Sequence, residues 1–368
     1  MEKIIKNFLV DGEVVLCERH GAGHINETYK VDLNNDGKVK SYILQRVNTQ
    51  LFTDMDKLMS NISGVTNFLR EKIIKEGGNP DRETLTVIKT KDDKDYYFDK
   101  ETGSSYRMFL FIEDALALQK AEKPEQFKSS AQAFGKFANM LADYDASTLY
   151  ETIKFFHDTT VRFENFKKAV AFNYQNRAEK IKEEIKFALD REEYASRIVN
   201  KIKDGRIPLK VTHNDTKLNN VLFDKDGVSA IAVIDLDTVM PGSILYDFGD
   251  SIRFGCNTGA EDEVDLTKVT FSMELFDTYV DGYLSEMGAS ITKEELSELA
   301  FSAILLTYEC GIRFLGDYLS GDTYFKIHLE NHNLDRARTQ FKLVKEMENR
   351  YDEMVAIVNK YAKKYVKA

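Results

Sequence analysis

The sequence contains no tryptophan, only four prolines and only three cysteines among 368 residues. The scarcity of proline excludes proline-rich linkers between domains. Cys17, Cys256 and Cys310 are odd in number and widely spaced, so they match neither a disulfide framework nor a zinc site. The cysteines therefore predict buried thiols in a reducing compartment, and we expect a cytoplasmic protein.

Two further features are missing, an excess of positive charge and a long apolar run. Asp and Glu number 61 against 51 Lys and Arg, a net charge of −10, so neither nucleic acid nor an anionic membrane is an expected partner. No apolar run approaches a membrane span, and residues 1–10 lack a signal-peptide core. The length allows two domains with a core each, and we expect a monomer.

One polar segment between short apolar strands carries the functional signal. It reads His213-Asn214-Asp215-Thr216-Lys217-Leu218-Asn219-Asn220, and a second strand ends fifteen residues later at Asp235. A kinase catalytic loop has this spacing: its Asp accepts the proton of the attacking hydroxyl, while its Asn and a later Asp hold magnesium. The pattern therefore predicts phosphoryl transfer from ATP, with Asp215 as the base and Asn220 and Asp235 as ligands of Mg²⁺.

The same residue types also form ordinary turns, which is the alternative interpretation of this segment. Residues 224–227 read as a simple hairpin turn, because a calcium loop would need further acidic ligands and a closing Glu. The strand that ends at Asp235, and the following Tyr246-Asp247-Phe248-Gly249-Asp250, favour catalysis. We expect Asp247 to order the catalytic loop by accepting backbone hydrogen bonds.

The chain divides into a strand-rich part and a helix-rich part. Alternating apolar runs predict strands at 13–18, 28–33, 41–47 and 107–112, a hairpin from 83–90 and 95–99, and one amphipathic helix through 58–73. Helical patterns follow from about 125, with a helical insertion near 160–203 and later helices near 270–287, 293–320 and 334–366. These patterns predict an α+β, bilobal protein-kinase-like fold, with a small antiparallel-sheet N-lobe at 1–112 and a larger, mainly helical C-lobe at 113–368.

Three places in the predicted N-lobe are candidates for nucleotide binding. Gly21 and Gly23 lie between the first two strands, where their amides could approach phosphates, although a plain hairpin is the alternative. Gln45 stands on the third strand where a kinase has its phosphate-binding lysine, and an amide donates without adding charge. This leaves an inactive pseudokinase open. Phe111 and Ile112 would form the hinge that binds adenine.

The motifs resemble those of the aminoglycoside phosphotransferase and choline kinase superfamily, small-molecule kinases with a protein-kinase-like fold. The resemblance rests on the loop with Asp215 and Asn220, on Ile234-Asp235-Leu236-Asp237 and on Tyr246-Asp247. Longer stretches are similar to its bacterial N-acetylhexosamine 1-kinase branch, namely 23–26, 42–45, 211–220, 234–242, 247–255 and 309–315. The resemblance covers nearly the whole chain, and it implies that the branch shares the missing lysine at Gln45.

The resemblance implies that ATP phosphorylates the anomeric hydroxyl of GlcNAc or GalNAc, with a small-molecule sugar as partner and ATP and Mg²⁺ as cofactors. It adds Asp237 to the magnesium-binding residues. It also suggests that Lys217 neutralises charge on the transferred phosphoryl group.

Sugar-binding candidates beside Asp215 are His24, Arg313 and Tyr324. Arg313 offers a fork of donors to hydroxyls or to an acetamide carbonyl, although Glu309, Arg313 and Asp317 could also form a simple ion-pair ladder. A kinase for another small hydroxyl compound, such as an aminoglycoside, choline or an amino-acid alcohol, remains the alternative. An arginine suits a cationic acceptor poorly, so the neutral sugar is preferred.

Overall fold

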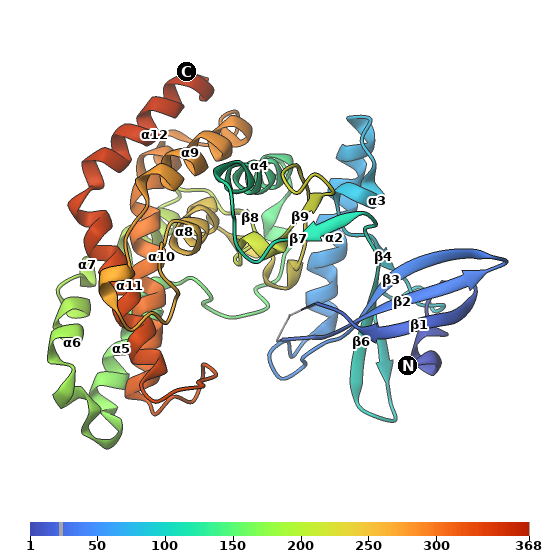
Figure 1. The fold of residues 1–368 in the computed structure, drawn as a ribbon, viewed down its shortest axis with the longest axis horizontal. Helices are drawn as coiled ribbons and strands as arrows, with labels where there is room; N and C mark the ends of the chain where they lie inside the picture. Colours follow the sequence, from blue (N-terminus) through green and yellow to red (C-terminus); the bar gives the residue numbers. More distant parts are fainter. Residues whose placement is uncertain (22–24, 368) are drawn as a thin grey trace. The chain divides into compact units, whose positions relative to one another are not determined.

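The computed structural model describes residues 1–21 and 25–367 (Figure 1). Gly23 and His24 lie outside the described residues. The chain groups into two compact units: unit 1 comprises Met1–Leu118, Asp143–Ile153 and Asn220–Pro241, and unit 2 comprises Gln119–Ala142, Lys154–Asn219 and Gly242–Ala368. The sequence-based boundary after residue 112 kept 113–368 together. The structure differs in assigning three short segments, 113–118, 143–153 and 220–241, to the first unit.

The main sheet of unit 1 is antiparallel, in the strand order β1-β2-β3-β6-β4 with β5 also on β6. Its strands are β1 (Glu13–Arg19), β2 (Glu27–Asn35), β3 (Lys38–Arg46), β4 (Val87–Ile88), β5 (Tyr97–Asp99) and β6 (Ser104–Leu110). Asp36 and Gly37 both have positive φ, 50° and 83°, which is the two-residue turn that suits a hairpin such as β2–β3. The buried face packs Val31, Leu44 and Met108 together.

The predicted hairpin of 83–90 with 95–99 is wrong, because β4 and β5 each pair with β6 and not with each other. Strand β6 is buried at all but its last position, which makes it the central strand to which both short strands add. Glu83 belongs instead to the short helix α3 (Pro80–Glu83), and the strand predicted at 107–112 runs from Ser104 to Leu110.

The rest of unit 1 supports a second, smaller sheet in the order β10-β9-β7. Its strands are β7 (Ala115–Ala117), β9 (Val221–Asp224) and β10 (Ala230–Val233), and the other elements are α1 (Glu2–Ile5), α2 (Met55–Lys75), η1 (Ala146–Thr148), η4 (Leu236–Thr238) and β11 (Met240–Gly242), whose last residue belongs to unit 2. Between β9 and β10, Asp226 accepts hydrogen bonds from the N–H groups of Val228 and Ser229, and Gly227 has φ 67°. This segment is the simple hairpin turn that the sequence predicts.

Unit 2 is mainly helical. Its helices are α4 (Pro124–Met140), α5 (Thr159–Phe172), α6 (Lys182–Leu189), α7 (Glu192–Lys203), α8 (Ile244–Gly255), α9 (Met273–Met287), α10 (Lys293–Leu319), α11 (His332–Asn349) and α12 (Tyr351–Tyr365). Shorter elements are η2 (Tyr174–Lys180), β8 (Lys210–Thr212), η3 (Leu218–Asn220), which ends in unit 1, and η5 (Leu266–Lys268). The helix predicted at 334–366 is therefore two helices, which break at Arg350. The predicted α+β fold is confirmed, with the antiparallel sheet in the N-terminal part and a mainly helical remainder.

Helix α10 forms the core of unit 2 and packs against α5, α8 and α11 (Figure 1). It begins with a capping box, in which Thr292 and Glu295 satisfy each other's backbone N–H groups. Within the described chain, α10 alone is long and apolar enough to cross a membrane. However, 83% of its most apolar window is buried inside the protein, as in the core helix of a globular protein.

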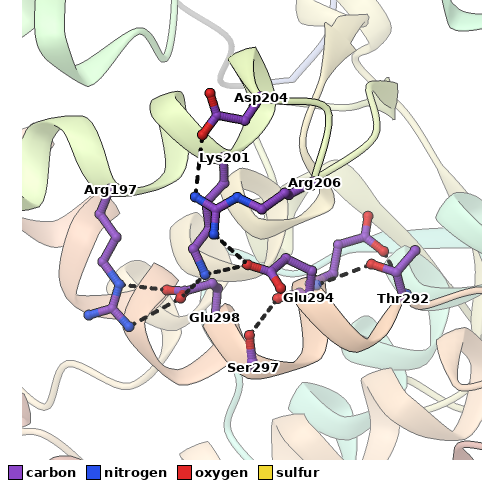
Figure 2. Close-up of polar contacts among 9 residues, drawn as sticks. Arg197, Lys201, Asp204, Arg206, Thr292, Glu294, Ser297 and Glu298 are labelled. Atoms are coloured by element: carbon purple, nitrogen blue, oxygen red, sulfur yellow. Dashed lines mark hydrogen bonds and ion pairs between the residues drawn. The ribbon is translucent and has the colours of Figure 1, made fainter.

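Ion pairs join α7 to α10 at the surface of unit 2 (Figure 2). Glu298 accepts from Arg197 at 2.8 Å and from Lys201 at 2.6 Å, and Lys201 also pairs with Glu294 at 2.6 Å. Arg206 extends this α7–α10 ion cluster towards Asp204. The cluster thus connects two helices that are almost a hundred residues apart in sequence.

Candidate functional site

The predicted catalytic loop after β8 is held in unit 2 by Asp247, in the first turn of α8. Oδ2 of Asp247 accepts from the backbone N–H of His213 at 2.8 Å, and Oδ1 accepts from that of Asn214 at 2.7 Å. The hydroxyl of Thr216 donates to the carbonyl oxygen of Asp247 at 2.6 Å. The predicted ordering role of Asp247 is therefore confirmed. Burial raises the pKa of its carboxyl, which the two N–H donors and His213 oppose.

His213 supports Asp215, which lies two residues further along the loop. Its ring is fully buried and packs edge-to-face against Phe134 and Phe137. Nδ1 of His213 accepts from the backbone N–H of Asp215 at 3.2 Å, so the ring fixes the backbone from which the Asp215 side chain projects. Asp215 itself is half-buried, which leaves its carboxylate partly exposed.

Lys217 lies beside Asp215, with Nζ 2.7 Å from Oδ1. Burial alone would lower the pKa of the Lys217 amine, but the carboxylates of Asp215 and Asp250 outweigh burial and raise it. Lys217 therefore carries a positive charge next to Asp215. Such a charge can offset negative charge that develops on a reacting phosphoryl group.

The two predicted magnesium ligands Asn220 and Asp235 come together in unit 1. Val221 of β9 pairs with Val233 of β10, and the N–H of Ile234 donates to the carbonyl oxygen of Asn220 at 2.9 Å. This register brings Asn220, at the start of one strand, close to Asp235, just after the other. Asp235 is exposed and has the left-handed backbone φ 61°, ψ 58°, while Asn220 is buried.

Asp237, the third predicted metal residue, has two polar partners in unit 1. Its Oδ1 lies 2.5 Å from Nη2 of Arg107, and its Oδ2 accepts from Nδ2 of Asn26 at 2.6 Å. Arg107 stands on β6 directly opposite Gln45 of β3, and its Nε donates to Oε1 of Gln45 at 2.9 Å. Gln45, predicted to bind nucleotide, thus contacts the arginine that holds Asp237.

Asn220 and Asp235 fit a magnesium ion by their chemistry. An amide oxygen and a carboxylate are the hard donors that Mg²⁺ takes, and the ion usually binds through one or two carboxylates, waters and phosphate oxygens. No group of three or more His, Cys, Asp or Glu side chains suited to a metal occurs in 1–21 and 25–367. The Asn–Asp pair is therefore suited to a metal whose coordination is completed by substrate and water.

The other nucleotide candidates lie around the β1–β2 hairpin and the end of β6. Gly21 has φ 75°, a conformation that other residues rarely adopt. Phe111 packs its ring edge-to-face against His20 at 5.7 Å, and Nζ of Lys30 lies 4.9 Å from the same ring. Ile112 is buried. Gly21, Phe111 and Ile112 thus belong to one unit, whereas Asp215, Arg313 and Tyr324 belong to the other.

Arg313, a sugar-binding candidate in unit 2, does not form an ion-pair ladder with Glu309 and Asp317, although the spacing of the three residues would allow one. Glu309 pairs with Nδ1 of His157 at 2.8 Å and accepts from the Thr159 hydroxyl at 2.7 Å. The Arg313 guanidinium lies over Phe156 at 5.9 Å and Phe325 at 5.5 Å.

Asp317 organises the loop after α10 that carries Tyr324. It accepts from the backbone N–H groups of residues 323–325 at 2.8–2.9 Å. The Tyr324 ring is 64% exposed. Asp317 thus fixes the loop that presents an accessible aromatic ring.

Sequence reasoning missed two arginines, Arg107 and Arg162. Arg107 is a single cation in an otherwise uncharged strand, and Arg162 lies in a helix that also carries Lys167 and Lys168. Only the strand pairing or the helix packing reveals the neighbours of each arginine. Burial lowers the pKa of Arg162, and the nearby charge of Arg313 lowers it further. The proximity of Arg162 to Arg313 and Tyr324 makes it a further candidate for contact with a substrate.

Comparison with known proteins agrees with this fold. One similar solved structure is the aminoglycoside phosphotransferase of Alicyclobacillus acidocaldarius, with 12% identity, coverage of 99% of this chain and 96% of the other, and a TM-score of 0.59. A microcompartment-associated aminopropanol kinase has 13% identity, coverage of 95% and 96% and a TM-score of 0.55. Choline kinase from Cryptosporidium parvum Iowa II has 12% identity, coverage of 95% and 93% and a TM-score of 0.51.

The sequence also matches a family directly. The match to APH, described as the phosphotransferase enzyme family, spans residues 90–289, which is more than half of the chain and includes the predicted catalytic loop and all three predicted magnesium-binding residues. This chain belongs to the APH phosphotransferase enzyme family and is a small-molecule kinase.

Proposed function

We propose that this kinase transfers the γ-phosphoryl group of ATP to the anomeric hydroxyl of an N-acetylhexosamine, GlcNAc or GalNAc. A bond forms between the sugar oxygen on carbon 1 and the γ-phosphorus. The bond from that phosphorus to the leaving oxygen of ADP breaks, and the hydroxyl proton passes to Asp215. The observation that carries the proposal is the support of Asp215 by buried His213, which Asp247 fixes in turn.

The remaining proposed roles are binding of the metal, binding of ATP and neutralisation of charge on the transferred group. Asn220 and Asp235 are the proposed direct ligands of Mg²⁺, and Asp237, two residues after Asp235, is proposed to support this set. The ion, when bound, neutralises charge on the phosphates. Gly21, Gly23, Gln45, Phe111 and Ile112 are proposed to bind ATP. Lys217 is proposed to offset charge at the transferred group, since its amine lies 2.7 Å from Asp215.

The proposed acceptor contacts are His24, Arg313 and Tyr324. Tyr324 is exposed and can stack on a sugar ring, and Arg313 can donate to hydroxyls or to the acetamide oxygen. Arg162 and Arg313 are close enough for one charge to lower the pKa of the other group, after the larger effect of burial. Two neighbouring guanidinium groups favour a neutral or electron-rich acceptor.

The second candidate is a kinase for an amino alcohol or an aminoglycoside. The names of the similar solved structures, an aminoglycoside phosphotransferase, an aminopropanol kinase and a choline kinase, suggest such acceptors. Their identity of 12–13% supports a common fold without a common substrate. Arg162 and Arg313 disfavour a cationic acceptor, although the carboxylates of Glu309 and Asp158 offset part of this positive charge, and we therefore prefer the sugar.

We also propose that the enzyme works as a monomer in the cytoplasm. Cys17, Cys256 and Cys310 are all free thiols; Cys256 is buried as predicted, whereas Cys17 and Cys310 are only half-buried. Burial raises the pKa of the Cys310 thiol to about 11, which keeps it protonated and unreactive at neutral pH. Free thiols of this kind suit a reducing compartment.

The test is ADP release with Mg-ATP and each of six acceptors: GlcNAc, GalNAc, glucose, galactose, kanamycin and choline. Turnover confined to the two N-acetylhexosamines, with the product phosphate on carbon 1 by phosphorus NMR, is expected. Turnover on kanamycin or choline would support the second candidate instead. Binding of ATP without turnover on any of the six would contradict the proposed sugar specificity.

A single substitution sharpens the assignment of the acceptor contacts. Arg313→Ala should raise the KM for the sugar about tenfold or more and leave the KM for ATP within twofold, because a lost donor pair to a substrate costs about 1.4 kcal/mol or more. The matched control is Arg336→Ala on α11, whose guanidinium also lies over an aromatic ring, that of Phe314. Equal changes in both KM values would remove Arg313 from the acceptor site.

A further inference from the structure

A chain of hydrogen bonds crosses three strands of the main sheet of unit 1 and ends at Arg107. Nε2 of Gln45 donates to the Thr28 hydroxyl at 3.0 Å, and Oε1 of Gln45 accepts from Nε of Arg107 at 2.9 Å. Thr28, Gln45 and Arg107 are consecutive partners across β2, β3 and β6. The strand pairing and the hydrogen bond to Gln45 thus orient the guanidinium of Arg107 independently of its contact with Asp237.

Arg107 and Asp237 form a buried ion pair. Their side chains are 2% and 7% exposed, and Nη1 of Arg107 has no hydrogen-bond partner among the described residues. A buried pair gives up hydration that its own attraction only partly replaces, so such a pair is weak evidence for a role in stability. The pair instead constrains geometry, because a planar, always charged guanidinium restricts the orientation of the carboxylate beside it.

Asn26 approaches Asp237 from the opposite side. Its Nδ2 donates to Oδ2 of Asp237 at 2.6 Å, while its Oδ1 accepts from the backbone N–H of Asn48 at 3.0 Å. Oδ1 of Asp237 is thus in an ion pair with Arg107 but makes no hydrogen bond to any described residue, whereas Oδ2 accepts a hydrogen bond from Asn26. The side chain has little freedom to rotate.

Asp237 in turn restrains Asp235, two residues earlier. Asp235 has the left-handed φ of 61°, which costs a residue with a side chain about 1 kcal/mol and persists only where the surroundings hold it. On one side Ile234 is bonded to Asn220, and on the other side Asp237 is bonded to Arg107. Beyond Asp237, Asn61 of α2 donates to the carbonyl oxygen of Val239 at 2.9 Å.

We propose that Arg107 is a positioning residue for magnesium, acting through Asp237 to hold Asp235 in the conformation that binds the ion. The inference rests on the proposed function, in which Asp235 is a metal ligand. Arg107 also supplies a fixed positive charge next to Gln45, which stands where a kinase lysine would be. Removal of a residue that orients a metal ligand typically weakens metal binding by about 10–100-fold.

The experiment measures the metal response of the whole chain without any sugar. At fixed, saturating ADP, the melting temperature is followed as MgCl₂ is added, and Mn²⁺ binding is measured in parallel by electron paramagnetic resonance. Arg107→Gln should raise the concentration of metal at the midpoint about tenfold or more. Arg107→Lys keeps the charge and protects folding. One ammonium cannot bridge Gln45 and Asp237 with the fork of a guanidinium, so a similar shift is expected.

Two further variants separate the possible outcomes. Arg46→Gln is the matched control, because Arg46 is the next residue on β3, is 45% exposed and bonds to Ser104; its midpoint should stay within twofold of the wild type. Asp235→Asn should shift the midpoint at least as far as Arg107→Gln. A shifted midpoint for Asp235→Asn with wild-type midpoints for both Arg107 variants would overturn the role of Arg107. A wild-type midpoint for Asp235→Asn would overturn the metal assignment of the proposed function, and the inference with it.

Discussion

In unit 1, Asp237 is held by Arg107, whereas in unit 2, Glu298 is held by Arg197 and Lys201 (Figure 2). Both carboxylates are buried, with 7% and 4% of their side chains exposed. The cations differ: Arg107 is 2% exposed, but Arg197 is 40% exposed and stays in contact with water. Both units therefore contain an arginine–carboxylate ion pair, but only in unit 1 is the arginine as fully removed from water as the carboxylate.

This difference has a physical consequence for each pair. Arg197 of the α7–α10 ion cluster can be lost cheaply, because water and the second cation, Lys201, replace what is removed. Arg107 cannot be replaced in that way, since its removal leaves the Asp237 charge buried without a counter-charge. A fully buried pair is costly to disturb and precise in geometry, which suits a site next to a proposed metal ligand. The α7–α10 ion cluster suits the joining of two helices.

The largest expected effect lies outside both ion pairs, at the residue proposed to do chemistry. Asp215→Asn removes proton acceptance but keeps the size of the side chain, so kcat should fall by about 10²–10⁴-fold. The melting temperature should change by less than about 2 °C, because Asp215 is half-buried and its loop is held by Asp247. Steady-state kinetics and thermal unfolding measure the two quantities.

Asp226→Asn is the control for this substitution, because it makes the same change of Asp to Asn in a simple hairpin turn. It should leave kcat within twofold. Near-normal turnover in Asp215→Asn would show that Asp215 is not the base. It would also remove the reason to regard residues 213–220 as the catalytic part of the chain.

The next effect tests the comparison directly, through the free energy of unfolding in urea. Arg107→Gln should lower it by about 3–5 kcal/mol, because one charge of a buried pair is left alone. Arg197→Gln should lower it by about 0–1 kcal/mol, because Arg197 is partly exposed and Lys201 still neutralises Glu298. Equal losses would mean that burial does not separate the two pairs.

A third prediction concerns acid, at a buried carboxylate of unit 2. Burial alone would raise the pKa of the Glu309 carboxyl, but His157 and Arg313 outweigh it and hold the pKa below its usual 4.5. A depressed pKa in the folded state contributes stability in full above about pH 4.5 and loses it as the pH falls through the folded value. Between about pH 5 and pH 3, wild type should therefore lose more stability than Glu309→Gln.

Urea unfolding at several pH values between about 3 and 7 measures this difference. Glu330→Gln, at an exposed position, serves as the control and should follow the wild type. Parallel curves for wild type and Glu309→Gln would show that the His157–Glu309 pair has no part in acid sensitivity.

The sequence predicts the parts of this molecule that local patterns determine. The turn at Asp226 depends on residues close together in the chain. Asp247 bonds to loop residues 33 and 34 positions earlier, but both segments carry recognisable motifs in the sequence. The contact of Arg107 with Gln45 and Asp237 could not be predicted, because it depends on a strand register between segments about sixty residues apart and on a further segment from another part of the chain. Sequence periodicity has no information about such a register.

The smallest effect is expected at the rim of the α7–α10 ion cluster. Arg206 is 51% exposed and pairs with Glu294 at 3.4 Å and with Asp204 at 3.5 Å. Arg206→Gln should change the free energy of unfolding by less than about 0.5 kcal/mol, since water already screens both pairs. Measured with Arg107→Gln and Arg197→Gln, it completes a series in which the exposure of the arginine increases from 2% through 40% to 51%. A loss at Arg206 as large as at Arg107 would show that exposure does not set the cost of losing an arginine in this protein.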